Sequence, residues 1–303
     1  MIDRLRRIQH ARSGWYWLVV VAGVVVGEVT AASADKISDG SGPVEAPRSL
    51  LDLPTMHPPQ SLAQHQDQET TNDTACVPES FKIALDIGHT PQASGATSAR
   101  GVKEYKFNVQ LAKQMESKLI QGGFSNTTLI TARGAGRDQL RMRVERANAL
   151  GADLLLSIHH DDVQEIYYSK WKYGGSLRNY SDRFAGYSLF VSRDNQHFDK
   201  SLAFAKLLGR ELRAKDLRFS AHHAEPIAGE NREIIDSGAG IYRYDDLFVL
   251  KFSVAPAVLL EAGIIVNRNE ELELSSPERR DQISGAVLAA LKEFCGAFDR
   301  RPN

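Results

Sequence analysis

The sequence predicts an α/β fold, in a single domain with a twisted, mostly parallel sheet flanked by helices on both faces. Short apolar runs at residues 81–87, 153–158 and 255–261 alternate with helix-like segments. These runs are apolar nearly throughout, rather than only in every second position, as expected for strands buried on both faces. Strands that alternate with helices are typical of parallel sheets, which have helices on both sides.

The remaining elements follow from periodicity and from breaker residues. Further strands are expected at 127–131 and 187–192, and helices at 104–121, 140–150, 199–214 and 277–298. In the first helix, apolar residues recur at helical spacing, namely Phe107, Leu111, Met115 and Leu119. Gly122 and Gly123 then end it.

The first 80 residues are expected to lie outside the fold. Arginines precede an apolar stretch at 15–26, and small residues follow at 32–34, so residues 1–34 read as a secretory signal peptide. An uncleaved membrane anchor is the alternative. Residues 35–80 are rich in Ser, Asp, Gln, Thr and Pro, which predicts a disordered linker. The folded domain is expected at 81–300, exported to the periplasm or cell wall, with no stable membrane span in the mature form.

Charge and cysteine content narrow the possibilities. The formal net charge of -1 argues against a broad nucleic-acid surface, which normally has a cationic excess. The two cysteines, Cys76 and Cys295, flank the predicted domain. In an oxidising compartment they can form a disulfide between its beginning and its end, and the alternative is two unrelated thiols.

Four residues carry the chemistry that the sequence suggests: His89, Glu104, His159 and Glu261. Each follows or ends a strand-like run, or begins a helix-like one. In a parallel sheet such positions share one rim, beyond the carboxyl ends of the strands. Two imidazoles and a carboxylate are a common donor set for catalytic zinc, and a further glutamate can accept a proton from water. The set therefore predicts a metal-dependent hydrolase.

Two long segments fit the alternating pattern less well, 161–186 and 220–246. Long insertions at a catalytic rim are often binding loops or lids, although surface decoration is the alternative. The second insertion contains His222 and His223. The neighbouring His160 should point to the opposite side of the strand from His159, so it is not counted as a ligand.

The ordered motifs resemble the zinc-dependent N-acetylmuramoyl-L-alanine amidases of the amidase-3 type. They are D-I-G-H-T at 86–90, G-V-K-E-Y-K-F-N at 101–108, S-I-H at 157–159 and V-L-L-E-A-G-I-I-V-N at 258–267. Between the second and third lie Thr131, Arg133, Leu140, Arg143 and Ala147-Asn148, as in that family. The sequence departs from the family pattern at Ile87, Thr90-Pro91, His160-Asp161 and Ile264, which bears on substrate preference more than on zinc binding.

The resemblance implies that His89, Glu104 and His159 hold Zn²⁺ and that Glu261 is the general base. It also implies peptidoglycan as substrate, cleaved between N-acetylmuramic acid and L-alanine. Asp86 is a candidate to orient His89, with a structural role as the alternative. In some relatives an inserted helix blocks the site until a protein activator moves it, and here Glu165 or Glu230 is a candidate to cap the metal. Alternative functions are an exported zinc peptidase or deacetylase of the same fold, or a non-catalytic wall-binding protein.

Overall fold

The structure is a computed structural model that describes residues 76–298. These residues contain a seven-stranded sheet in the order β2-β1-β3-β9-β6-β8-β7. The strands are β1 (Ile83–Ile87), β2 (Thr127–Ile130), β3 (Leu154–Asp161), β6 (Ser188–Val191), β7 (Ile234–Asp236), β8 (Ile241–Arg243) and β9 (Ala257–Ile264). The helices are α1 (Glu104–Gln121), α2 (Arg137–Leu150), α3 (Phe198–Ala214), α4 (Phe248–Phe252), α5 (Glu270–Leu274) and α6 (Pro277–Phe298).

The sheet is mixed but mostly parallel, which confirms the predicted fold class. Strands β2, β1, β3 and β9 are parallel neighbours, so their carboxyl ends form one rim. Strand β6 runs antiparallel to β9, and β8 runs parallel to β6. The predicted strands at 81–87, 153–158 and 255–261 correspond to β1, β3 and β9, the strands that approach the site.

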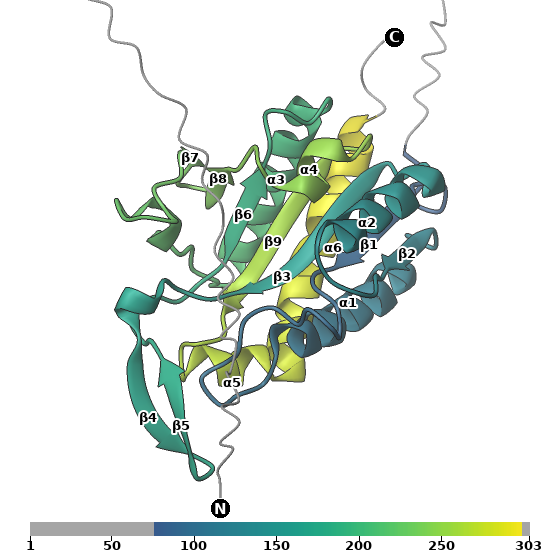
Figure 1. Ribbon diagram of the computed structural model, residues 1–303. Helices are drawn as coiled ribbons and strands as arrows, with labels where there is room; N and C mark the ends of the chain where they lie inside the picture. Colours follow the sequence, from purple (N-terminus) through teal and green to yellow (C-terminus); the bar gives the residue numbers. More distant parts are fainter. Residues whose placement is uncertain (1–75, 299–303) are drawn as a thin grey trace, which may run out of the picture. The chain divides into compact units, whose positions relative to one another are not determined.

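Helices cover both faces of the sheet (Figure 1). The larger core lies between the sheet and α1, α3 and α6, and a second core lies between the sheet and α2 and α4. The four apolar positions predicted for α1 are all buried, namely Phe107, Leu111, Met115 and Leu119. The helix predicted at 140–150 begins earlier, at Arg137.

Cys76 and Cys295 form a disulfide, as expected from their placement. Their Cα atoms are 5.4 Å apart, within the range that a disulfide spans. The bond joins the segment before β1 to α6 across a sequence separation of 219 residues, so it fastens the beginning of the described domain to its last helix.

Both predicted insertions contain secondary structure. The first contains a short helix, η1 (Glu165–Tyr167), and the antiparallel hairpin of β4 (Ser169–Tyr173) and β5 (Ser176–Tyr180), which projects from the body of the domain (Figure 1). The second contains η2 (His222–Ala224) together with β7 and β8.

The predicted signal peptide at 1–34 and most of the linker at 35–80 lie outside the described residues. Their boundaries, and that of the domain at 81–300, stay predictions. Among residues 76–298, none of the helices has both the length and the apolar character needed to cross a bilayer.

Candidate functional site

Three of the predicted site residues meet at the carboxyl rim of the sheet. His89 follows β1, Glu104 begins α1, and His159 lies near the end of β3. His89 Nε2 lies 2.9 Å from Glu104 Oε2, and His159 Nδ1 lies 3.1 Å from Glu104 Oε1. A helix that follows a parallel strand begins near the carboxyl end of that strand. The loop after β1 therefore brings the first residue of α1 back to this rim.

The Glu104 carboxylate is held by hydrogen bonds from three further groups. Ala96 N donates to Oε2 at 3.0 Å, and Asn108 Nδ2 and His160 N donate to Oε1 at 3.1 and 3.3 Å. Asn108 lies one helical turn after Glu104, so α1 itself aligns the amide with the carboxylate. These bonds fix the orientation of the carboxylate before any ion arrives.

Glu104 is ionised despite its burial. Burial alone would raise the pKa of this carboxyl, but the hydrogen bonds to His159 and His89 outweigh it and hold the pKa well below its usual value. An ionised carboxylate between two imidazoles offers a cation one negative charge and two nitrogen ligands.

Two glycines allow the three side chains to approach closely. A Cβ on Gly88 would lie 2.4 Å from His159 Nε2. A Cβ on Gly95 would lie 2.2 Å from Glu104 Oε2, and Gly95 also has a positive φ of 71°. Gly95 thus provides both a turn in the left-handed region and space for the carboxylate.

The donor set fits a zinc ion. The candidate ligand atoms of His89, Glu104 and His159 all lie within 4.8 Å of one another. Zinc takes nitrogen and oxygen ligands at about 2.0–2.2 Å, which puts neighbouring tetrahedral ligands roughly 3.3 Å apart. The separations of 2.9 and 3.1 Å to Glu104 are close to that spacing.

Glu261 lies beside this group. It pairs with His159 in the register of β3 and β9. Its Oε2 atom is buried and has no hydrogen-bond partner in the part of the chain that the structure describes. Burial, together with the charges of Asp161 and Glu104, raises its pKa well above the usual value. An unpartnered carboxylate with a raised pKa suits a proton acceptor that works near neutral pH.

Asp86 contacts Arg143 rather than His89. Its Oδ1 accepts from Arg143 Nη1 at 2.7 Å, and its Oδ2 accepts from Ser157 Oγ at 2.7 Å. The same guanidinium donates to the backbone carbonyls of Ile87 and His89. Asp86 therefore acts on the loop through Arg143, which fastens the backbone on both sides of Gly88.

His160 supports Glu104 from the other side of the strand. Burial lowers its pKa to about 3, so the ring is neutral. Its Nδ1 donates to Asn108 Oδ1 at 2.7 Å, and Asn108 in turn donates to Glu104. The group of ligand atoms that meet at the rim does not include His160, and the expectation that His160 is not a ligand stays a prediction.

A second cluster of ligand-type side chains was not predicted from the sequence. It comprises Asp161 at the end of β3 and His222 and His223 in η2. Glu230, considered as a cap for the metal, instead accepts from His223 Nδ1 at 2.8 Å. Glu165 lies exposed in η1. The adjacent histidines were visible in the sequence, but their approach to Asp161 depends on how the second insertion folds.

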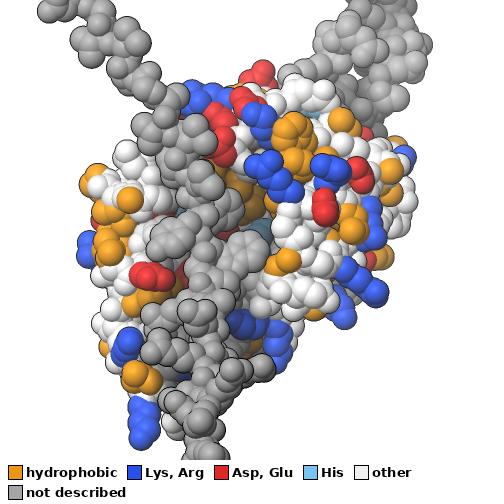
Figure 2. All heavy atoms as spheres, in the orientation of Figure 1, with side chains coloured by type: hydrophobic (Ala, Val, Ile, Leu, Met, Phe, Trp, Pro, Cys, Tyr) orange, Lys and Arg blue, Asp and Glu red, His pale blue; other side chains and the backbone are white. Residues whose placement is uncertain are grey.

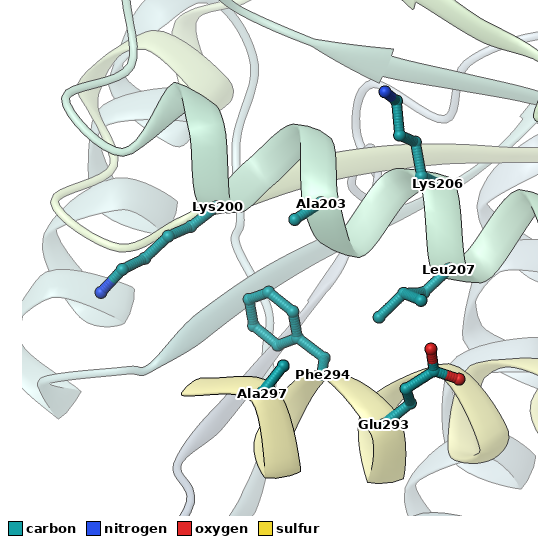
Figure 3. A pocket seen from close by; sticks show the side chains of 7 residues that line it. All are labelled: Lys200, Ala203, Lys206, Leu207, Glu293, Phe294 and Ala297. Carbon is teal, nitrogen blue, oxygen red and sulfur yellow. The ribbon is translucent and has the colours of Figure 1, made fainter. Parts of the chain in front are cut away.

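The pocket between α3 and α6 lies apart from both clusters of ligand-type side chains in the described residues. It is lined by Ala203, Leu207, Phe294 and Ala297, with charged side chains at its edge (Figure 3). Those helices contribute no residue to the His89–Glu104–His159 group. Where Figure 2 shows coloured side chains, basic ones are interspersed with acidic and hydrophobic ones.

Comparison with known proteins identifies the family. A family model described as N-acetylmuramoyl-L-alanine amidase matches residues 83–293, which include all four predicted site residues. The chain belongs to this family. Its members are hydrolytic enzymes, and the expectation of an enzyme of this type is confirmed.

Individual relatives in this amidase family are distant. A putative N-acetylmuramoyl-L-alanine amidase of Buchnera aphidicola is 26% identical over 223 residues, covering 70% of this chain and 95% of the relative. N-acetylmuramoyl-L-alanine amidase AmiA of Escherichia coli is 25% identical over 237 residues, covering 72% and 78%. Among solved structures, the amidase Ami1 of Mycobacterium smegmatis superposes with a TM-score of 0.55 at 19% identity, covering 72% of this chain and 98% of that one. That structural likeness supports the fold.

Proposed function

We propose that this amidase-family chain is an exported zinc enzyme that hydrolyses the amide bond between N-acetylmuramic acid and L-alanine in peptidoglycan. The observation that carries the proposal is the pairing of His159 with Glu261, which sets a buried, unpartnered carboxylate beside the His89–Glu104–His159 group. Metal-assisted amide hydrolysis needs such a pair of neighbouring functions, an ion site and a proton acceptor.

His89, Glu104 and His159 would hold the zinc ion through His89 Nε2, His159 Nδ1 and a Glu104 oxygen. Bound zinc supplies a Lewis acid that polarises the amide carbonyl and lowers the pKa of water to about 7. Three protein ligands would leave the fourth coordination position open for water or substrate.

Glu261 would take the proton from the attacking water and pass it to the departing amine nitrogen of L-alanine. The raised pKa of Glu261 favours the second half of this transfer, because a weakly acidic carboxyl holds a proton until the leaving group needs it. The reaction then balances: the C–N bond breaks, water supplies a hydroxyl to the lactyl carbonyl, and the amine leaves protonated.

Export to the periplasm or cell wall is part of the proposal. The disulfide between Cys76 and Cys295 supports it, since such bonds persist mainly in oxidising compartments. The proposal includes a protein activator that moves one of the insertions away from the site, so deleting the responsible insertion should raise basal activity.

The roles are tested with metal-free protein, reloaded with zinc, acting on purified peptidoglycan. We expect chelation to abolish product release, zinc to restore it, and Glu261→Gln to lower the rate by about 10²–10⁴-fold, the usual contribution of a general base. Glu261→Gln should still bind zinc, because Glu261 is not among the proposed ligands. Glu145→Gln, at an exposed glutamate in α2, is the matched control and should behave as wild type. A Glu261→Gln variant with full activity would contradict the assignment.

A further inference from the structure

A second group of metal-ligand side chains lies at the end of β3. Asp161 Oδ2 is approached by two imidazole nitrogens, His223 Nε2 at 2.8 Å and His222 Nε2 at 3.2 Å. The three ligand atoms lie within 4.8 Å of one another. This is the same donor set as in the first group, two imidazoles and one carboxylate, and nothing in the proposed reaction uses it.

Hydrogen bonds among the described residues account for only one of the two ring nitrogens of His222. Its side chain is 1% exposed, and its Nε2 has no hydrogen-bond partner among the described residues, although it lies only 3.2 Å from Asp161 Oδ2. A buried imidazole nitrogen without a partner is unfavourable unless another group or an ion occupies the space in front of it.

The outward nitrogens of both imidazoles are anchored. His222 Nδ1 pairs with Ser220 Oγ at 2.9 Å, and His223 Nδ1 pairs with Glu230 Oε2 at 2.8 Å. Gln164 Nε2 in turn donates to Glu230 Oε1 at 2.9 Å. Metal-binding histidines commonly have this arrangement, in which a carboxylate or hydroxyl fixes the ring so that the other nitrogen faces the ion.

We propose that Asp161, His222 and His223 form a second site for a divalent transition-metal ion of the zinc class. Imidazole nitrogens and a single carboxylate favour zinc and its neighbours over calcium or magnesium, which prefer sets of oxygen ligands. Three protein ligands again leave a position open for water or another donor.

The second ion would join two parts of the fold. Asp161 belongs to β3, whereas both histidines belong to η2 in the insertion at 220–246, and His223 is 62 positions away from Asp161 in sequence. Asp161 also lies two positions after His159 on the same strand. Occupancy would thus fasten the insertion to the rim that carries the first group.

Metal stoichiometry tests the site without reference to activity. Metal-free protein is saturated with zinc, freed of excess ion, and analysed by native mass spectrometry and elemental analysis. We expect two zinc ions per chain in the wild type and one in each of His222→Gln, His223→Gln and Asp161→Asn. His89→Ala should also retain one ion, whereas His89→Ala combined with His222→Gln should retain none.

His197→Gln is the matched control, because His197 precedes α3 and belongs to neither cluster. It should keep both ions. Circular dichroism of each metal-free variant shows whether it is folded. If a variant at the second site fails to fold, the wild type and His89→Ala decide between the outcomes. With the second site they should hold two ions and one ion, and without it one ion and none. A single ion in the wild type, or two that survive His222→Gln and His223→Gln, would overturn the proposal and leave the cluster as a buried ion pair.

The outcome is independent of the proposed reaction. Loss of one ion in the His222→Gln variant would support the second site even if the protein cleaved a different bond. A single ion in a wild-type protein that is active would rule out the second site and leave the proposed function untouched.

Discussion

Gly95 offers a sharp test of the first metal group, because a single methyl group there meets two of the proposed ligands. An alanine Cβ would lie 2.2 Å from Glu104 Oε2 and 2.6 Å from His89 Cδ2. Atoms cannot approach so closely, so Gly95→Ala must displace the carboxylate, the imidazole or the loop. The residue also has a φ of 71°, which disfavours any side chain.

Gly134→Ala separates the steric clash with the ligands from the cost of the left-handed backbone. The φ of Gly134 is 82°, but a Cβ there would have no atom within 4 Å. Both alanine variants should therefore lose about 1–2 kcal/mol of stability from the left-handed backbone alone. Only Gly95→Ala should also weaken zinc binding, by about 10–100-fold, the range found when the support of a metal ligand is disturbed.

The assay is zinc competition with a chromophoric chelator, alongside urea denaturation of the metal-free proteins. The relevant ion is the one that His89→Ala removes. Equal zinc affinity in Gly95→Ala and Gly134→Ala would refute the reasoning, since it would mean that the loop at Gly95 does not limit the position of Glu104.

Three further predictions concern stability, each measured by urea denaturation of metal-free protein. Arg143→Met should cost about 3–5 kcal/mol, because it leaves the buried Asp86 carboxylate without its cation. Adding Asp86→Asn should recover much of that loss, and no recovery would argue against the ion pair as the cause. Cys295→Ser should cost about 2–5 kcal/mol by opening the disulfide, and Cys76→Ser should match it. Burial raises the pKa of Glu270 from 4.5 to about 7. The unfolded chain releases this proton first, so the stability that Glu270 contributes is complete below pH 4.5 and is lost as pH rises towards 7. Glu270→Gln should remove about 3 kcal/mol of that decline, and an unchanged pH profile would contradict the shift.

Much of the site could be predicted from the sequence, because the apolar runs that mark the strands agree with the parallel topology that brings their ends together. The apolar runs of β1, β3 and β9 are short and buried, and site residues follow or end each of them. Parallel pairing then brings these residues to one rim. Helix α1 begins at Glu104, the position that its periodicity and its acidic start indicated.

The direction of β6 could not be predicted. Its four residues, Ser-Leu-Phe-Val, carry no sign of its direction, and its antiparallel pairing with β9 depends on the route of the chain after the β4–β5 hairpin. The β4–β5 hairpin was not predicted, although the sequence contains a pattern that indicates it. Gly174 and Gly175 form a two-residue turn between segments rich in Trp and Tyr, a typical hairpin pattern.

The cluster of Asp161, His222 and His223 could not be predicted from the sequence, for a different reason. Asp161, His222 and His223 come from separate segments, and no local pattern fixes the distance between a strand end and a loop 62 residues later. Arg143 is a similar case. Its position in α2 was visible, but its hydrogen bonds to the carbonyls of Ile87 and His89 depend on how α2 packs against the sheet.

The most direct test of the central claim is hydrolysis of a defined N-acetylmuramoyl peptide by the zinc-loaded protein in water enriched in heavy oxygen. The account predicts free peptide beginning with L-alanine, together with N-acetylmuramic acid that carries the label in its lactyl carboxylate. Cleavage within the stem peptide, or release of labelled acetate, would contradict the account and assign the site to a peptidase or a deacetylase.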